Sequence, residues 1–314
     1  MTTREGLHKE KERILMKKKK SEELSRIIKR INVIEKERPS HKEILQFVKG
    51  IIREQHKIKP SIKVKRIDIN EETAKNQMKE GFPLIDKKDI KLDMNSAENL
   101  FKNICKALQR KEKIAPEIKK ITQAIRKGEI DLKELFGKLI AGDKAYIDSA
   151  GEKTELNRWL LLFLAESSIH PVLEAYAEKL KGYVDQEIWF RGYCPVCGSA
   201  PVLGELRKDA GERFLQCSSC SFQWRFKRLA CPFCGNEDHK KLRHFHTEAD
   251  GKAYRVDVCE ECKKYIKTID LRELNVEVVP LVEDMSTLHL DIIAEKEGYK
   301  RGVPGILEME KSGE

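Results

Sequence analysis

Eight of the nine cysteines in this 314-residue chain fall in four Cys-x-x-Cys pairs, a spacing typical of metal binding. Two residues between the cysteines allow both sulfurs to face one ion. The first and third pairs read Cys-Pro-Val-Cys-Gly and Cys-Pro-Phe-Cys-Gly, where proline presets the turn and glycine permits a positive φ angle. Because four thiolates complete one tetrahedral site, the pattern predicts two metal sites, with the ligands Cys194, Cys197, Cys217, Cys220, Cys231, Cys234, Cys259 and Cys262.

The segments between the pairs predict which cysteines share an ion. Each segment reads as two strands joined by a tight turn, at 208–211 in the first and at 248–251 in the second. A hairpin brings its two ends together, so successive pairs should meet. We therefore expect Cys194, Cys197, Cys217 and Cys220 to form site 1, and Cys231, Cys234, Cys259 and Cys262 to form site 2. An interleaved pairing is the alternative.

The chemistry of four sulfurs suits zinc and iron alike. Zinc would hold together ribbons that are too small to fold alone, whereas iron would form a rubredoxin-type site able to carry one electron. The spacing by itself favours zinc. Three nearby histidines, His239, His244 and His246, are expected to be surface or packing residues, because each site already has four cysteines.

The elements that position these cysteines change in kind near Gly192. Up to about residue 188 the apolar residues recur at helical spacing, and the most apolar helix, about 154–168, should be the buried centre of a helical domain. Pro171 is expected to kink or restart that helix. Cys105 lies on a helical stripe and is expected in the core. Beyond Gly192 short strands and turns replace the helices, and 281–295 reads as one closing helix.

That closing helix carries Asp284, His289 and Asp291, of which Asp284 and Asp291 are seven residues apart and would share one face. We interpret this face as solvated, with contact to a partner as the alternative.

Composition excludes several classes of protein. The chain is 40% hydrophobic and 36% charged, and its longest apolar run, 159–165, is far shorter than the ~20 residues of a membrane helix, so we expect no membrane insertion. The N-terminus lacks the apolar region of a secretory signal, which predicts a cytoplasmic protein whose paired cysteines bind metal. No phosphate-binding glycine loop or Gly-x-Ser-x-Gly motif is present, so we predict a protein without enzymatic activity.

The net charge of +10 is concentrated near the N-terminus, since residues 1–38 hold 13 Lys and Arg against 7 Glu. A solvated helix face explains this charge better than nucleic-acid binding does. A second basic stretch, Arg225, Lys227 and Arg228, is interleaved with Phe222, Trp224 and Phe226. Aromatic and arginine side chains in such a pattern can stack on nucleic-acid bases. The alternation instead favours a strand whose aromatic side chains pack between the two ribbons. Nucleic acid is therefore not the expected partner.

Several of these motifs together resemble the FdhE family, the formate dehydrogenase accessory (formation) proteins. The similarity is specific over about 158–300 and loose over 40–157, where the best landmark is Gly81-Phe82-Pro83-Leu84. The segments that carry it are 191–202, 215–224, 228–235, Cys259-Glu260-Glu261-Cys262 with the following 265–267, and 284–291.

The resemblance implies an α+β multidomain architecture, with an all-α helical N-terminal domain, two rubredoxin-like or zinc-ribbon modules and a closing helix. It implies a cytoplasmic factor that is required for active respiratory formate dehydrogenase. Such a factor would bind the catalytic subunit of that molybdenum- or tungsten-pterin enzyme, and would bind iron through its cysteines, with zinc as the alternative. Two other functions stay open, a zinc-ribbon nucleic-acid-binding protein and a rubredoxin-like electron-transfer protein.

The expected domain boundaries follow from the patterns above. They are a basic helical extension over 1–38, the helical domain over 39–190, the first module over 191–229, the second over 230–270, and the C-terminal helix and tail over 271–314. The oligomeric state is left open.

Overall fold

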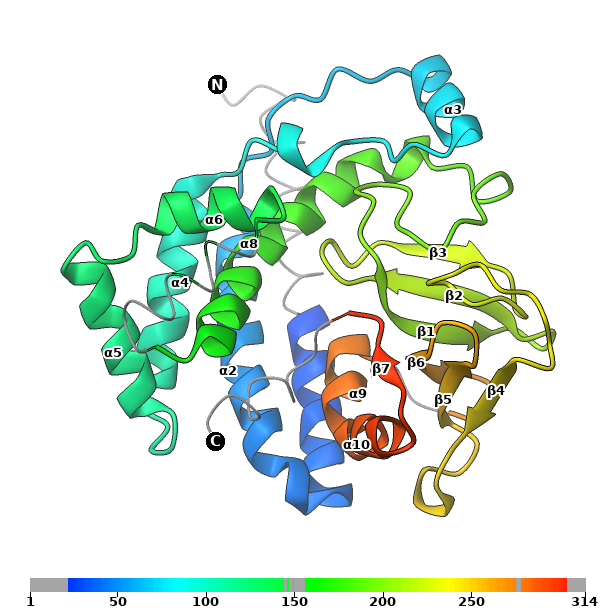
Figure 1. Cartoon of the computed structure of the whole chain (residues 1–314). Helices are drawn as coiled ribbons and strands as arrows, with labels where there is room; N and C mark the ends of the chain where they lie inside the picture. Colours follow the sequence, from blue (N-terminus) through cyan, green and yellow to red (C-terminus); the bar gives the residue numbers. More distant parts are fainter. Residues whose placement is uncertain (1–21, 144–145, 147–148, 150–155, 275–277, 304–314) are drawn as a thin grey trace, which may run out of the picture.

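The computed structural model describes residues 22–143, 146, 149, 156–274 and 278–303. The lysine run at 17–20 lies outside this range. Within the described part, the first half of the chain is helical, as the periodicity predicts (Figure 1). After a helix over 22–37 come α2 (Lys42–Ile58), α3 (Glu71–Glu80), α4 (Met94–Leu108), α5 (Ala115–Arg126), α6 (Leu132–Ile140) and α8 (Arg158–Leu180), with short 3-10 turns at Pro39–His41, Lys59–Ser61, Lys87–Asp89 and Lys181–Tyr183. None of the described helices is both long and apolar enough to cross a membrane.

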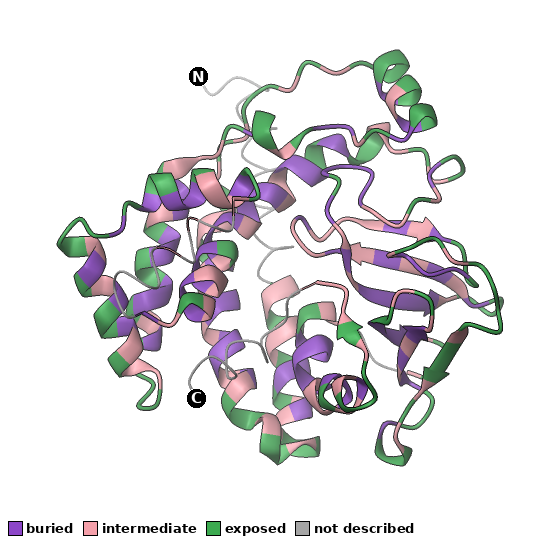
Figure 2. Ribbon diagram, viewed as in Figure 1, coloured by how far each residue is buried: buried purple, intermediate pink, exposed green. Residues whose placement is uncertain are grey.

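Helix α8 is the centre of the helical domain and packs against α2 and α4 (Figures 1 and 2). Its Leu161 and Leu164 are fully buried, as expected for the most apolar stretch of the sequence. The helix does not restart at Pro171 but continues through it to Leu180. Cys105 on α4 is also buried, which confirms the prediction of a core residue, and burial raises the pKa of its thiol to about 12.

The strands of both ribbons join in one sheet. Residues 201–217 and 242–259 form the two predicted hairpins. In the described part, seven strands pair in the order β3-β2-β1-β6-β5-β4, with β7 beside β6. Their bounds are β1 (Pro201–Arg207), β2 (Glu212–Cys217), β3 (Gln223–Phe226), β4 (Leu242–Phe245), β5 (Tyr254–Cys259), β6 (Lys264–Asp270) and β7 (Lys300–Arg301).

A parallel pairing of β1 with β6 connects the two ribbons, and Gly204 lies opposite Thr268 in it. A β-carbon at Gly204 would stand 2.7 Å from the Thr268 hydroxyl oxygen, so this close approach requires glycine. The modules are therefore continuous through backbone hydrogen bonds.

The prediction of one closing helix is wrong in one respect. The segment forms two short helices, α9 (Pro280–Ser286) and α10 (Leu288–Lys296), which are separated at Thr287 by a non-helical backbone conformation (φ −118°, ψ 28°). Helix α9 packs against α2, whereas α10 packs against β5, β6 and β7.

The prediction of a solvated face for Asp284 and Asp291 is also wrong. Both side chains are buried, and the ammonium group of Lys267 on β6 lies 2.7 Å from a carboxylate oxygen of Asp284 and 2.6 Å from one of Asp291. Arg301 on β7 adds a second cation, 2.6 Å from Asp284. A seven-residue spacing predicts that two side chains share a face, but it does not show what covers that face.

The helix over 22–37 is part of the core. Its Ile31 and Ile34 are buried, and Arg30 donates a bidentate pair of hydrogen bonds to Glu283 of α9. Arg38, just after the helix, bonds Asp250 at 2.7 Å. The described part of the basic N-terminal segment therefore joins the closing helices to the second ribbon.

Candidate metal centres

Site 1 brings together the sulfurs of Cys194, Cys197, Cys217 and Cys220, all of them buried. Cys194 and Cys197 lie in the loop before β1, Cys217 ends β2, and Cys220 lies in the following turn. Three sulfur–sulfur distances are 3.5 Å (Cys197 to Cys217), 3.6 Å (Cys197 to Cys220) and 3.7 Å (Cys194 to Cys220).

Site 2 is formed in the same way by Cys231, Cys234, Cys259 and Cys262. The sulfurs of Cys231 and Cys262 are 3.7 Å apart, as are those of Cys234 and Cys259. The two sites differ in exposure, because Cys234 is exposed and Cys262 is partly exposed. The sulfurs thus gather in the sequential groups that the hairpins predict, whereas their role as metal ligands stays a prediction.

Both sulfur clusters fit a tetrahedral ion. A metal with bonds of about 2.3 Å to four sulfurs holds those sulfurs roughly 3.8 Å apart, close to the separations at both sites. Burial raises the pKa of the Cys194 and Cys231 thiols, which opposes the thiolate form unless a cation is bound. These eight residues would hold two ions of zinc or iron, which would supply structural cross-links or, for iron, one-electron chemistry.

The local backbone explains how each pair brings its two sulfurs to one side. The amide of Gly198 donates to the carbonyl of Cys194, and the amide of Gly235 donates to the carbonyl of Cys231. A left-handed residue follows the second cysteine of all four pairs: Gly198, Ser221, Gly235 and Lys263. Sequence reasoning identified the two glycines but missed Ser221 and Lys263, because serine and lysine rarely adopt positive φ.

Hydrogen bonds to sulfur add to this arrangement. The amides of Ser219 and Cys220 lie 3.3 and 3.4 Å from the Cys217 sulfur, and the side-chain amide of Asn236 lies 3.7 Å from the Cys259 sulfur. Such donors stabilise a thiolate and tune a metal bound to it.

The helical domain covers site 1. The amide of Leu84 donates to the carbonyl of Pro195 at 2.8 Å, and the amide of Ile85 donates to the carbonyl of Val196 at 3.0 Å. At the second pair of cysteines in site 1, His170 of α8 hydrogen-bonds the hydroxyl of Ser221, the residue after Cys220, at 3.0 Å. The sequence landmark at 81–84 is therefore the loop that fastens the helical domain to the first pair of cysteines.

The remaining candidate residues do not join the clusters. His239, His244 and His246 are exposed and belong to neither sulfur group, in agreement with the sequence interpretation. Trp224 and Phe226 of β3 are buried in the same core cluster as the helical domain, and Phe222 is partly buried against it, so these aromatic residues pack inward at the edge of the sheet. Arg225 pairs with Glu187 and Lys227 pairs with Glu237, so the basic stretch is partly neutralised.

This fold and these sites define a class of protein in which a helical domain is joined to a sheet with two tetracysteine clusters. Two family models match adjoining segments within the second half of the chain, the FdhE central domain over 193–228 and the FdhE C-terminal domain over 229–307. Over these two adjoining segments the chain is similar to the FdhE family.

Relatives and a solved structure are consistent with this family. The Protein FdhE homolog of Aquifex aeolicus (strain VF5) is 28% identical over 285 residues, which cover 89% of this chain and 93% of that protein. The Protein FdhE homolog of Haemophilus ducreyi is 36% identical over 128 residues, covering 40% of this chain and 41% of that protein. The crystal structure of the FdhE protein from Pseudomonas aeruginosa shares the fold, with a TM-score of 0.64, 21% identity, and coverage of 90% of this chain and 94% of that one.

Proposed function

We propose that this protein is a non-enzymatic accessory factor for the maturation of respiratory formate dehydrogenase, acting in the cytoplasm on the catalytic subunit of that enzyme. The observation that carries the proposal is the pair of tetracysteine clusters inside the segment that matches both FdhE domain models. The residue patterns that resemble the family extend from the first cysteine pair to the closing helices, and all eight cysteines are present.

The eight cysteines would each ligate a metal ion, with iron favoured by the resemblance and zinc as the alternative. An ion at site 1 would act mainly as a cross-link, since its four sulfurs are buried beneath the helical domain. An ion at site 2 would lie near the surface, because Cys234 is exposed, and would shape the face that meets the client subunit. The domain boundaries at 38, 190, 229 and 270 are part of the same proposal.

The proposal is tested by purifying the tagged full-length protein anaerobically from its own cytosol and identifying what accompanies it. The expected result is recovery of a formate dehydrogenase catalytic subunit with the wild-type protein and its loss with Cys234→Ser. The matched control is Cys105→Ala, which removes a buried cysteine outside both clusters and should keep the subunit. Recovery of nucleic acid without the subunit would overturn the proposal.

Electron transfer is a second candidate, favoured by the exposure of Cys234 at site 2. An iron ion held there would be accessible to a redox partner. This function requires a visible thiolate-to-iron absorption band that bleaches reversibly on reduction. A colourless zinc protein that still supports formate dehydrogenase activity would exclude it.

A further inference from the structure

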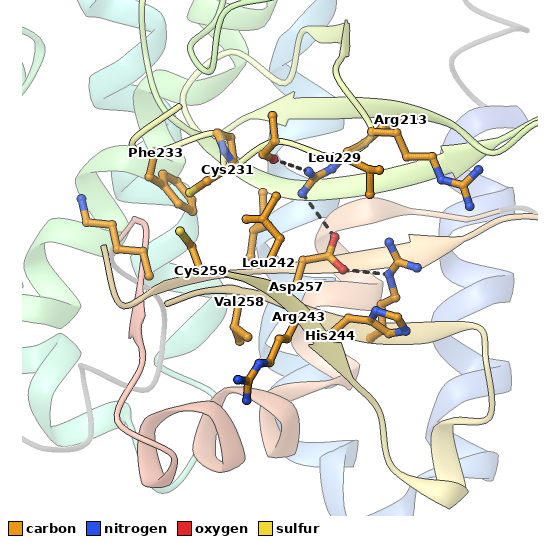
Figure 3. Close-up of a pocket in the computed structure, with 16 residues that line it drawn as sticks. Arg213, Leu229, Cys231, Phe233, Leu242, Arg243, His244, Asp257, Val258 and Cys259 are labelled. Atoms are coloured by element: carbon orange, nitrogen blue, oxygen red, sulfur yellow. Dashed lines mark hydrogen bonds and ion pairs between the residues drawn. The ribbon is translucent and has the colours of Figure 1, made fainter. Parts of the chain in front are cut away.

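A small cavity lies between the two ribbons, beside site 2 (Figure 3). Its volume is about 80 Å³, which is enough for a small ion, given that a water molecule occupies ~30 Å³ in the liquid. Cys231 and Cys259 lie on one side of it, and Asp257 and His244 lie on the other. No sequence motif pointed to this cavity, because its walls come from both hairpins and are adjacent only in the folded sheet.

The charges that line the cavity are strongly unbalanced. Asp257 is the one carboxylate among the lining residues, against five cationic side chains: Arg213, Arg228, Arg243, Arg255 and Lys264. Arg243 points away from the cavity and lies 3.8 Å from Glu260 (Figure 3). At the centre, the Asp257 carboxylate is shared by Arg213 at 3.2 Å and Arg255 at 2.8 Å. These three side chains alone carry one net positive charge, while Cys231 and Cys259 on the opposite wall would add negative charge as metal-bound thiolates.

One N–H group of Arg213 has no hydrogen-bond acceptor in this cavity. Its guanidinium donates to the carbonyl of Ala230 at 2.9 Å and to Asp257, yet its buried Nε has no hydrogen-bond partner. The residue is only 3% exposed, so this N–H cannot be solvated freely. Burial lowers the pKa of Arg213, although Asp257 opposes the shift. An anionic acceptor in the cavity would satisfy both the hydrogen bond and the charge.

We infer that this cavity binds a small oxyanion of the carboxylate or phosphate class, with Arg213 Nε and the Arg255 guanidinium as donors. Planar guanidinium groups are the preferred partners of such anions. The anion comes either free from solution or as an acidic group of a partner protein. This site is separate from the proposed maturation function and from metal ligation, since its donors are arginines and not thiolates.

One other explanation is that the arginines neutralise site 2. Four thiolates with a divalent ion carry a net charge of −2 and would attract nearby cations. This explanation predicts a cavity without a bound anion. The two explanations differ in whether the Nε–H of Arg213 forms a hydrogen bond, because a bound oxyanion would accept one from it.

The test is a titration of the metal-loaded full-length protein with inorganic phosphate and, separately, formate, followed by NMR of ¹⁵N-labelled arginine side chains in chloride-free buffer. The expected result is a saturable shift of the Arg213 Nε–H signal with a midpoint of about 1 mM or lower. A shift that grows linearly without saturation, or no shift, would overturn the inference.

Three variants test whether the anion binds in this cavity or is only attracted to the surface charge. Arg255→Gln should weaken binding about tenfold or more through loss of a charged donor. Asp257→Asn should instead tighten binding, because it removes the competing carboxylate. Lys252→Gln, an equal loss of charge on the exposed turn of the same hairpin, should change nothing. Equal weakening in Arg255→Gln and Lys252→Gln would mean general surface attraction and would contradict a built site.

The source of the anion is decided by competition. A short glutamate-rich peptide that displaces phosphate would identify an acidic group of a partner as the ligand. Saturable phosphate or formate binding that the peptide does not displace would identify a free ion. Each result supports oxyanion binding, and the absence of saturable binding by all three probes contradicts it.

Discussion

At the scale of residues, the two cysteine clusters are alike in sequence but differ in accessibility. The loop after α3 and the side chain of His170 cover site 1, whereas Cys234 of site 2 is exposed. Because thiolate exchange and chelation require access to the sulfurs, this difference should govern the order of metal loss.

We expect site 2 to lose its ion before site 1. During incubation with a chelator and an alkylating reagent, Cys234 and Cys262 should be modified first, and Cys194 should be modified last, together with unfolding. The measurement is time-resolved mass spectrometry combined with metal analysis. Simultaneous release of both ions would show that the difference in burial has no kinetic effect.

The charges around Lys267 form a second feature at this scale. Lys267, Asp284 and Asp291 are buried, the side chain of Arg301 is only 7% exposed, and the two cations balance the two carboxylates. Tyr265 donates to Asp291 at 2.9 Å, which satisfies a further carboxylate oxygen. A balanced and hydrogen-bonded cluster is tolerated in the interior, but removal of one member leaves an uncompensated charge.

Lys267→Met should therefore lower the free energy of unfolding by about 3–5 kcal/mol, as measured by urea denaturation at neutral pH. The control is Lys264→Met, which removes the same charge from the exposed start of the same strand and should change stability by less than about 1 kcal/mol. Similar values for the two variants would show that the buried cluster contributes nothing specific.

At the scale of elements, side-chain caps determine where several helices begin. The carboxylate of Asp93 accepts hydrogen bonds from the Ser96 amide at 3.2 Å and the Ser96 hydroxyl at 2.8 Å at the start of α4. It also accepts from the Lys63 amide at 3.0 Å, which ties the extended segment before α3 to the same point.

Asp93→Ala should cost about 1–2 kcal/mol of stability, and Asp93→Asn much less, because asparagine retains the capping oxygen. Asp68→Ala, which removes an exposed aspartate, is the matched control. Urea denaturation of all three variants provides the comparison. Equal stability of Asp93→Ala and Asp93→Asn would contradict a capping role.

The pH dependence of this cap follows from the pKa of Asp93. Burial alone would raise that pKa, but the hydrogen bonds from Lys63 and Ser96 outweigh burial and lower it. Because an unfolded aspartate titrates near pH ~3.9, the stabilisation is complete above about pH 5 and is lost as the pH falls below about 4. The cost of Asp93→Ala should be constant from about pH 8 to 5 and smaller at pH ~3.

At the scale of the whole molecule, one sheet unites both ribbons, α10 packs on it, and the helix over 22–37 is joined to α9 by Arg30 and Glu283. The junction depends on Gly204, where a methyl group would displace the Thr268 hydroxyl from its 2.8 Å hydrogen bond to Asp257. The two cysteine clusters and the arginine-lined cavity thus belong to one sheet that is continuous across the β1–β6 pair.

Gly204→Ala should destabilise the protein by about 1–3 kcal/mol through overpacking. Gly50→Ala is the matched control, since no atom lies within 4 Å of a β-carbon at Gly50 and the helix favours alanine, so this variant should gain about 0.5–1 kcal/mol. Thermal unfolding of the two variants would show opposite shifts. A gain in stability for both would mean that β1 and β6 tolerate separation.

The sequence by itself determined the two groups of four cysteines, the hairpins between them, and the helical character of the first half. These are local properties, since Cys-x-x-Cys spacing, turn residues and apolar periodicity act over a few neighbouring residues. The parallel β1–β6 junction, the burial of Asp284 and Asp291, and the cavity around Arg213 were decided only by the tertiary structure. In each of these, residues distant in the sequence meet, and no local pattern records which charged side chain will find its partner in the interior.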